Sequence, residues 1–557
     1  MSDNQELVFV PLGGVGEIGM NLALYGYGKG RDMAWIAVDM GVAFGHDDLP
    51  GVDAVLPDIT YLKARKKNLV GIIITHAHED HFGALFDTWP DLGAPIFMTP
   101  FAAGLLEAKR SMEFGMPKLP VRIVNQGDRI NVGPFEIEYI PVSHSIPEPN
   151  ALAIRTPAGT VLHTGDWKLD TTPGLGRPID IDRLSAVGRE GVLALISDST
   201  NAVREGLGPS ESEVAAVLER LIDEAPQRVA VTTFASNVGR LRAVGIAAER
   251  TGRDVVIVGR AIRRAIDVAT ELGYMDGIKP FLDQDAYARL PRKQVVALMT
   301  GSQGEPRAAL AQIASGDHRA VSLAPGDRVI FSSRTIPGNE RAVNNIINAL
   351  IDMGADVYTD RNGLVHTSGH PRRDELRQLY DWIKPRILIP VHGEALHLSE
   401  QAKLGRAAGI PEVLEIRNGD LVRLAPGPAE KLSTVPTGRI YRDGRLRLPH
   451  ETSGVVERRR LAFAGVISIG VVLSDSGEVL EDPTVVLIGV PTAAQDGEKL
   501  AAIAEAAVDE ALDSLPKGRR RDATAVRDTV SRTVRSAVEM LWGKRPATVV
   551  HVTHVSD

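Results

Sequence analysis

The chain has 557 residues, of which 44% are hydrophobic and 24% charged, so it can fill more than one hydrophobic core and we expect two or three domains. It lacks cysteine, which excludes disulfides, and it lacks any apolar run of the ~18 residues that a membrane span requires, so we expect a soluble cytoplasmic protein that does not contact membranes. The net charge of −8 argues against a nucleic-acid partner, because phosphate binding favours a basic surface, unless bound cations or local arginines supply positive potential.

Short strands separated by glycine-rich turns are predicted at the start of the chain, over residues 7–10, 21–25 and 34–38. The segment 13–19 between the first two has the glycine spacing of a dinucleotide-binding loop. A strand rather than a helix follows it, so we interpret it as a β-turn region. The third strand ends at Asp39, which is either a turn residue or a support for the loop described next.

The most informative stretch is residues 75–81, Thr-His-Ala-His-Glu-Asp-His, which follows the apolar run 70–74. Three histidines and two carboxylates are too polar for the end of a buried strand unless a cation binds them. In an extended or turned chain, His76 and His78 point one way, while Asp80 and His81 can face a second position. The loop therefore predicts two adjacent metal sites, and its ligands suit zinc or manganese. A polar surface loop is the alternative, but it fits so dense a motif poorly.

Further candidate ligands stand just past the ends of later predicted strands. His144 follows the strand 135–140, Asp166 follows 160–162, and His392 follows 386–390. His144 alone would more often be an ordinary polar residue, and it becomes a candidate ligand because His76 and its neighbours are present.

The pattern changes after Ser210 to alternating helices and parallel-type strands, which predicts an α/β insert that ends near residue 363. We expect helices at 211–222, 238–250 and 261–272, and strands at 228–232, 254–258, 294–299 and 328–331. Ser236 and Asn237 open one helix, where backbone N–H groups can meet a phosphate. The loop 300–305 is a second candidate.

The last hundred residues predict a compact α/β module. We expect strands at 461–473, 484–489 and 547–554, and helices at 497–514 and 523–542. Its basic cluster, Lys517 with Arg519 to Arg521, either touches RNA or a partner subunit or is a solvated loop between helices.

The motif His76-x-His78-x-Asp80-His81 after a hydrophobic strand resembles the signature of the metallo-β-lactamase superfamily, and the later motifs resemble those of ribonuclease J, a family of bacterial β-CASP nucleases. This resemblance implies an α/β fold: a metallo-β-lactamase αββα sandwich with an inserted β-CASP α/β domain and a small C-terminal α/β domain. The implied boundaries are 1–208 and 364–445 for the sandwich, 209–363 for the insert, 446–460 for a linker and 461–557 for the last domain.

The resemblance also implies roles for named residues. Asp39 would support the metal loop, residues 197–200 would be the first β-CASP motif, and His366 and His392 the second and third. The implied metal ligands are His76, His78 and His144 for one ion, Asp80, His81 and His392 for the other, with Asp166 bridging them. The implied catalytic residues are Asp80, Asp166 and His366. The implied substrate-binding residues are Ser236, Asn237, His366, Thr367, Ser368, Gly369 and His370, and a weaker calcium site would use Gly51, Asp53 and Asp443.

The function that the resemblance implies is hydrolysis of RNA with two zinc or manganese ions, which would activate water and neutralise phosphate charge. The family combines 5′-to-3′ exonuclease activity, which favours 5′-monophosphorylated ends, with endonuclease activity in RNA maturation and mRNA decay, and its members form homodimers or homotetramers. A thioesterase or lactonase on the same metal core is an alternative, against which stand the insert and the motifs of His366 and His392. A non-catalytic RNA-processing subunit is another, against which stands the complete ligand set.

Overall fold

The computed structural model describes residues 5–45, 48–113, 115–495 and 497–556. The chain divides into two compact units, Met1–Ala43 with Val55–Ile440, and Phe44–Ala54 with Tyr441–Asp557, and each is described here by itself.

The first unit contains two large sheets. The strands of one sheet, in spatial order, are β24 (Glu430–Thr434), β23 (Asp420–Ala425), β1 (Glu6–Gly13), β3 (Leu22–Gly28), β4 (Ala34–Val38), β6 (Leu69–Ile73), β7 (Ile96–Met98) and β8 (Val121–Ile123). Those of the other are β22 (Glu412–Val413), β20 (Ile387–Val391), β13 (Ala194–Asp198), β12 (Gly159–His163), β11 (Asn150–Thr156), β10 (Phe135–Pro141) and β9 (Arg129–Val132). The short strands β2 (Val15–Gly16) and β21 (Gly393–Glu394) pair with each other.

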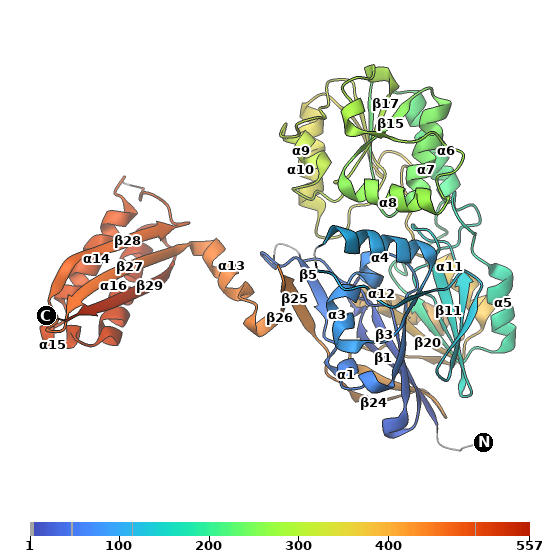
Figure 1. The fold of residues 1–557 in the computed structure, drawn as a ribbon, viewed down its shortest axis with the longest axis horizontal. Coiled ribbons are helices and arrows are strands. Elements are labelled where there is room, and N and C mark those ends of the chain that lie inside the picture. The colour runs from blue at the N-terminus through green and yellow to red at the C-terminus, as the bar shows by residue number, and fades with distance from the viewer. Residues whose placement is uncertain (1–4, 46–47, 114, 496, 557) are drawn as a thin grey trace. The chain divides into compact units, whose positions relative to one another are not determined.

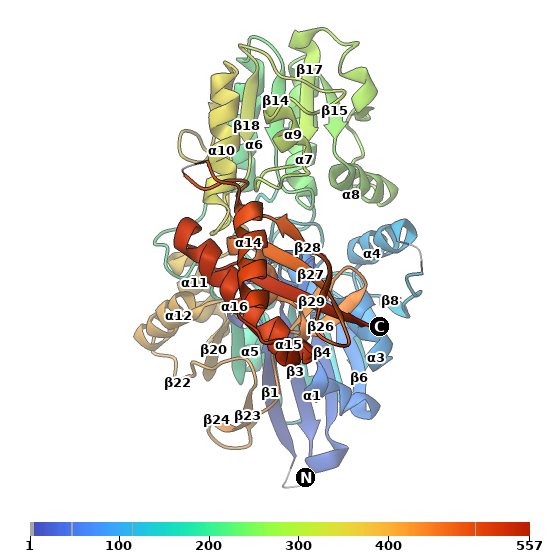
Figure 2. The ribbon, with the colours of Figure 1, turned by 90° about the vertical axis from the view of Figure 1, so that its left-hand side faces the viewer.

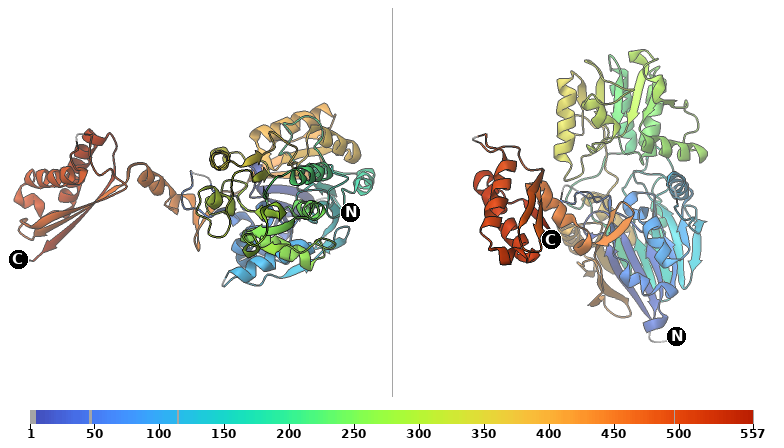
Figure 3. Two further views of the ribbon diagram at one scale, coloured as in Figure 1. Left: turned by 90° about the horizontal axis from the view of Figure 1, so that it is seen from above. Right: turned by 60° about the vertical axis from the view of Figure 1, so that its left-hand side comes forward.

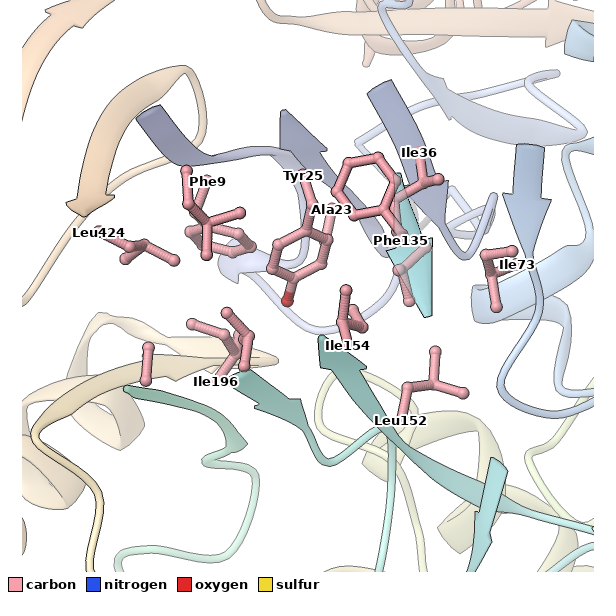
Figure 4. Packing of buried hydrophobic residues seen from close by; sticks show 14 of the residues in the cluster. Phe9, Ala23, Tyr25, Ile36, Ile73, Phe135, Leu152, Ile154, Ile196 and Leu424 are labelled. Carbon is pink, nitrogen blue, oxygen red and sulfur yellow. The ribbon is translucent and has the colours of Figure 1, made fainter. Parts of the chain in front are cut away.

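The two sheets pack face to face through a single apolar layer. Phe9 and Tyr25 of the first sheet meet Leu152, Ile154 and Ile196 of the second, and all five are fully buried (Figure 4). Burial of each such side chain contributes about 1.5–3 kcal/mol, which is why these strands read as nearly continuous hydrophobic runs in the sequence.

Helices cover the outer faces of the sandwich. They are α1 (Thr60–Lys63), α2 (Glu79–Phe82), α3 (Leu85–Leu92), α4 (Pro100–Met112), α5 (Ile181–Glu190), α11 (Arg373–Ile383) and α12 (Ala395–Ala407). On the second sheet, Leu184 of α5 and Leu379 of α11 join Leu195 and Leu388 in one buried cluster. Figure 1 shows α5 and α11 outside β11 and β20. The predicted αββα sandwich is confirmed.

The insert forms its own lobe around a parallel sheet (Figures 1 and 2). Its strands, in spatial order, are β16 (Leu282–Asp283), β15 (Asp254–Val258), β17 (Val295–Met299), β14 (Val229–Thr232), β18 (Arg328–Phe331) and β19 (Asp356–Tyr358). Its helices are α6 (Glu211–Asp223), α7 (Val238–Arg250), α8 (Arg260–Glu271), α9 (Ala309–Ala314) and α10 (Glu340–Asp352). Ser210 and Glu213 form a capping box that fixes the start of α6. The strands of the insert are parallel, as predicted.

The second unit ends in a three-stranded sheet, with β27 (Val466–Ser474) between β28 (Val479–Ile488) and β29 (Ala547–Val555). Its helices are α13 (Val455–Ala464), α14 (Leu500–Asp513), α15 (Lys517–Arg520) and α16 (Ala523–Trp542). Helices lie on one side of this sheet (Figure 3). There, Val526, Val530, Val534 and Val538 of α16 pack under the strands, all fully buried.

The tail differs from the prediction in its linker and in the start of its first strand. The predicted linker 446–460 contains β26 (Leu446–Pro449) and most of α13, and residues 461–464 are helical rather than the start of a strand. Strand β25 (Arg439–Asp443) precedes this segment, and β5 (Ala54–Pro57) lies earlier in the chain. Among the residues described, no helix has the length and apolar character of a membrane span.

Candidate active site

The first group of candidate ligands gathers at the carboxyl end of β6. His76 Nε2 and His144 Nε2 lie 3.2 and 3.0 Å from His78 Nδ1. Asp166 Oδ2 lies 3.9 Å from His76 Nε2 and 3.7 Å from His144 Nε2. Four ligand atoms from three separate strand ends therefore converge on one position, within 4.8 Å of one another.

The second group shares Asp166 with the first. His81 Nε2 and His392 Nε2 lie 3.2 and 3.4 Å from Asp166 Oδ2, and both also approach Asp80, at 3.6 and 3.9 Å. Asp80, His81, Asp166 and His392 again place one atom each within 4.8 Å. The structure thus brings together all seven residues that were expected to bind metal, in the two sets that were expected.

The electrostatics of these groups fit bound cations. Asp166 Oδ1 is buried without a hydrogen-bond partner among the described residues. Burial lowers the pKa of His144 to about 4, so its imidazole is neutral and free to ligate. Burial also acts on His81 and His392, but carboxylates, above all Asp166, outweigh it and raise their pKa. The negative charge of these carboxylates thus favours protonated forms of His81 and His392, and bound divalent cations would replace those protons.

Asp39 supports the ligand loop without joining either group, as predicted. Its carboxylate accepts hydrogen bonds from the Thr75 backbone N–H at 2.8 Å and from the Thr75 hydroxyl, and it lies 2.7 Å from His81 Nδ1. A carboxylate on the far nitrogen of an imidazole fixes the tautomer and orientation of a ligating histidine.

Asn21 performs a similar task for His392, and the sequence did not reveal it. Its side chain lies 3.0 Å from His392 Nδ1 and 3.1 Å from His81 Nε2. His392 has a left-handed backbone, with φ of 53°, and its N–H donates to Gly14 at 2.7 Å. A side chain on Gly14 would lie 2.2 Å from Asn21 Oδ1, which explains a glycine in the 13–19 turn.

The loop 366–370 approaches the metal ligands through its last two residues. The carbonyl oxygen of Gly369 lies 2.7 Å from His144 Nδ1, and His370 Nδ1 lies 2.8 Å from Asp198 Oδ2. Burial disfavours the charged imidazole of His370, but Asp198 and then Asp166 outweigh it and raise its pKa to about 9. His370 thus faces the ligand cluster, with Asp198 on its Nδ1.

His366 lies in a different environment from His370. Burial, and then the nearby cations Arg240, Arg334 and Lys168, lower its pKa to about 3, and its Nδ1 is buried without a hydrogen-bond partner in the described part of the chain. A neutral His366 can donate one N–H to an anion, but it is a poor proton donor to a leaving group. The predicted catalytic role therefore fits His370 better than His366.

Two other predicted substrate residues are occupied by structural hydrogen bonds. The Thr367 hydroxyl is buried and donates to the Pro209 carbonyl at 2.7 Å, and Ser368 Oγ accepts from Asn201 at 2.8 Å. At the start of α7, the Asn237 side chain caps the helix through the Arg240 N–H. Ser236 Oγ lies 3.1 Å from His78 Nε2 and is the side chain of this turn that faces the ligands.

The residues of the weaker calcium prediction lie in the second unit. Asp443 pairs with the guanidinium of Arg458, which also donates to the Pro50 carbonyl. Asp53 accepts the Gly444 N–H at 2.8 Å. A side chain on Gly51 would lie 2.7 Å from the Arg458 guanidinium. The positively charged guanidinium of Arg458 thus lies among these residues. The calcium site stays a prediction.

Comparison with known proteins supports this picture. Residues 40–214 match the model of the metallo-beta-lactamase superfamily, and residues 354–414 match "Zn-dependent metallo-hydrolase RNA specificity domain". Residues 226–350 match "Ribonuclease J, beta-CASP domain", and residues 454–555 match "Ribonuclease J C-terminal domain". Fold and site together define a metallo-β-lactamase-fold hydrolase with a β-CASP insert.

Full-length relatives narrow this class. Ribonuclease J of Sinorhizobium meliloti is 54% identical over 100% of this chain and 98% of its own. That of Mycolicibacterium smegmatis is 38% identical, over 98% and 96%. The chain belongs to the ribonuclease J family. A solved protein of unknown function from Enterococcus faecalis V583 shares the fold, with a TM-score of 0.53 over 75% of this chain and 100% of that one, at 16% identity.

Proposed function

We propose that this protein is a metal-dependent ribonuclease that hydrolyses RNA phosphodiesters. The single observation that carries the proposal is the pair of histidine and aspartate groups that share Asp166 at the base of the β-CASP insert. Membership of the ribonuclease J family supports RNA as the substrate. A thioesterase or lactonase would not need the insert.

We assign His76, His78 and His144 to one ion, Asp80, His81 and His392 to a second, and Asp166 to both. Two divalent ions, which we propose to be zinc with manganese as the alternative, would polarise the phosphodiester and activate water. Imidazole and carboxylate ligands without cysteine suit either metal. The protein orients this chemistry through Asp39 and Asn21, which hold His81 and His392 in place.

For the leaving group, we propose His370 as the proton donor. Asp198 holds its Nδ1, so its Nε2 carries the transferable proton. His366 and Ser236 would bind phosphate oxygens as neutral donors, while the loop 366–370 positions the RNA backbone. Asn237, Thr367 and Ser368 contribute by shaping this pocket.

We further propose 5′-to-3′ exonuclease activity that favours a 5′-monophosphate, together with internal cleavage. A pocket that binds the terminal phosphate would place the adjacent phosphodiester at the metal groups. RNA that carries a 5′-monophosphate would therefore be cleaved faster than RNA that lacks it.

A cytoplasmic location, a homodimeric or homotetrameric assembly and domain boundaries near residues 209, 363 and 446–460 stay predictions.

The test is elemental analysis of the purified protein combined with a cleavage assay. We expect two divalent ions per chain, and turnover of RNA but not of DNA or of a panel of thioesters. Chelation should abolish turnover, and zinc or manganese should restore it. One ion per chain would contradict the second ligand set, and thioester hydrolysis without RNA cleavage would overturn the function.

A further inference from the structure

Arg240, in the first turn of α7, is fully buried although it carries a charge. Its Nε and Nη2 donate to Glu211 Oε2 at 3.1 and 2.8 Å. Its Nη1 donates to the carbonyl oxygens of Ser332 and Val365 at 3.2 and 3.0 Å. A buried ion pair contributes little net stability, because its desolvation offsets its attraction, so its role is better sought in what it holds together.

The three partners of Arg240 come from three different stretches. Glu211 lies where the chain enters the insert, Ser332 follows β18 in the central sheet, and Val365 lies where the chain leaves the insert, one residue before His366. Ser332 Oγ also donates to the Val365 carbonyl at 2.7 Å. One planar guanidinium therefore fixes the entry, the sheet and the exit of the insert, which a lysine with a single nitrogen could not do.

The backbone of Arg240 holds a fourth stretch. Its N–H donates to Asn237 Oδ1 at 3.0 Å and so fixes the turn that carries Ser236. The side chain of the same residue fixes the segment that leads into the loop 366–370 through the Val365 carbonyl. Arg240 thus contacts both halves of the proposed phosphate pocket, one through its backbone and the other through its guanidinium, while lying outside the pocket.

A second buried cation, Lys168, holds the same two chain segments together where they enter and leave the insert. Lys168, two residues after Asp166, donates to the Pro209 carbonyl at 2.6 Å and to Thr367 Oγ1 at 3.1 Å. Pro209 is on the entering chain and Thr367 on the leaving chain. The two chain segments that enter and leave the insert are therefore held to the sandwich by Lys168 and to the insert by Arg240.

We infer that Arg240 is a positioning residue that sets the spacing between the Ser236 turn and the loop 366–370, and thereby the discrimination of the RNA 5′ end. The inference rests on the proposed ribonuclease function. Arg240 makes none of its hydrogen bonds to the proposed metal ligands, which all lie in the sandwich and of which His81 and His392 are held by Asp39 and Asn21.

The test is Arg240→Lys in the full chain. This substitution keeps the positive charge but replaces the planar guanidinium with a single nitrogen. Three substrates are compared: one RNA with a 5′-monophosphate, the same RNA with a 5′-hydroxyl, and bis(p-nitrophenyl) phosphate, which needs the metals but no RNA pocket. We expect the KM for the monophosphorylated RNA to rise and its preference over the 5′-hydroxyl RNA to fall about tenfold, because small misplacements of binding groups are costly. Bound metal and hydrolysis of the small diester should match the parent.

The matched control is Arg250→Lys, which alters an exposed arginine on the same helix that pairs with Glu219 at 2.9 Å. It should leave all three substrates unaffected. A second variant, Ser332→Ala, removes the hydroxyl that bridges Arg240 and Val365 without removing a charge, and should shift the preference in the same direction.

The outcomes separate the inference from the function. Folded Arg240→Lys and Ser332→Ala proteins with the parent's 5′ preference would overturn the positioning role. Loss of metal and of small-diester hydrolysis in both variants would also overturn it, since the residue would then support the whole scaffold. Failure of the metal-loaded parent to cleave any RNA would overturn the proposed function instead.

Discussion

At the scale of single residues, the proposed site separates metal binding from substrate binding. His76 belongs to the first ligand group, whereas His370, which lies 2.8 Å from Asp198, forms a third group with Asp198 and His392 that also places one atom of each residue within 4.8 Å. We propose that the first kind of residue determines whether the ions stay, and the second what they act on.

His370→Ala should lower RNA turnover about 100-fold or more and leave two ions per chain, because it removes a proton donor but no ligand of the two proposed sets. His76→Ala should lose metal and activity together. Elemental analysis beside single-turnover kinetics distinguishes the two variants. If His370→Ala also empties a site, then His370 is a ligand and its assignment as a donor fails.

Glu138 provides a prediction that depends on pH, away from the site. This buried carboxylate accepts hydrogen bonds from Arg183 at 2.6 Å and Arg155 at 2.7 Å. Burial alone would raise the pKa of Glu138, but these hydrogen bonds and charges outweigh it and hold the pKa below the ordinary 4.5. A carboxylate with a lowered pKa stabilises the fold above its ordinary pKa, and this contribution is lost as the pH falls through the folded value.

Glu138→Gln should therefore unfold more easily than the parent at pH 7, and the difference should shrink below about pH 4.5. Thermal unfolding followed from pH 7 to pH 3.5 checks this. Glu136→Gln, at a more exposed neighbour of the same strand, is the control and should change little. A difference that is constant with pH would exclude the charge of Glu138 as the cause.

The sequence pointed to the residues that gather in the two ligand groups and to Asp39 beside them, but not to Asn21 or Arg240. His76 and its neighbours form a dense local pattern that metal chemistry explains. Asn21 and Arg240 do not, because each acts through a contact with residues more than a hundred positions away: His392 for Asn21, and Val365 for Arg240. Local sequence does not distinguish an asparagine after a glycine turn, or an arginine in an amphipathic helix, from a surface residue. Only the tertiary contacts show their roles.

At the scale of secondary-structure elements, periodicity predicted α6, α7 and α8 and the four central strands of the insert, but it missed α9, α10, β16 and β19. In the tail, the errors fall where local signals conflict. Residues 461–464 are apolar and precede a valine-rich strand, but they complete the last turn of α13, which ends at Gly465 with φ of 68°. Strand β28 begins at Val479, before Pro483, whereas the prediction began after it. It is an edge strand, where proline is tolerated.

The buried valines of helix α16 allow a test of what stabilises the second unit. Val530→Ala should destabilise it by about 2 kcal/mol, because the valine is fully buried under the sheet and the alanine leaves a cavity. Hydrogen exchange of α16 amides in the full chain measures this locally. The control is Val456→Ala on α13, where the side chain is 53% exposed. Equal protection in Val530→Ala and the parent would mean that the stripe of valines does not support the fold.

At the scale of the whole molecule, the three-stranded sheet of the second unit has an exposed apolar face, which we propose as a surface for self-association. The face of its sheet away from α14 and α16 aligns Val486, Ser468 and Val549 in one row and Ile488, Val466 and Ala547 in the next, without a charge. Val486, Ile488 and Val549 are 48%, 62% and 44% exposed. An apolar sheet face of this kind is typical of protein interfaces.

We expect Ile488→Lys to convert a dimer or tetramer to a smaller species in analytical ultracentrifugation, since a second copy would otherwise cover this face. Truncation near residue 450 should have the same effect. Val456→Lys, on α13, is the control. An unchanged sedimentation coefficient in both Ile488→Lys and the truncated chain would remove this role from the last domain.

The order of the proposed ligands along the chain has a consequence for synthesis on the ribosome. The first set is complete once Asp166 has emerged, whereas the second waits for His392, which lies beyond the insert. Roughly 200 residues separate the two, and at about 5–20 residues per second this delay lasts on the order of 10 to 40 s. During that time the nascent chain would hold a complete proposed set for one ion but not for two. The second proposed set would be completed only after the β-CASP insert has been made.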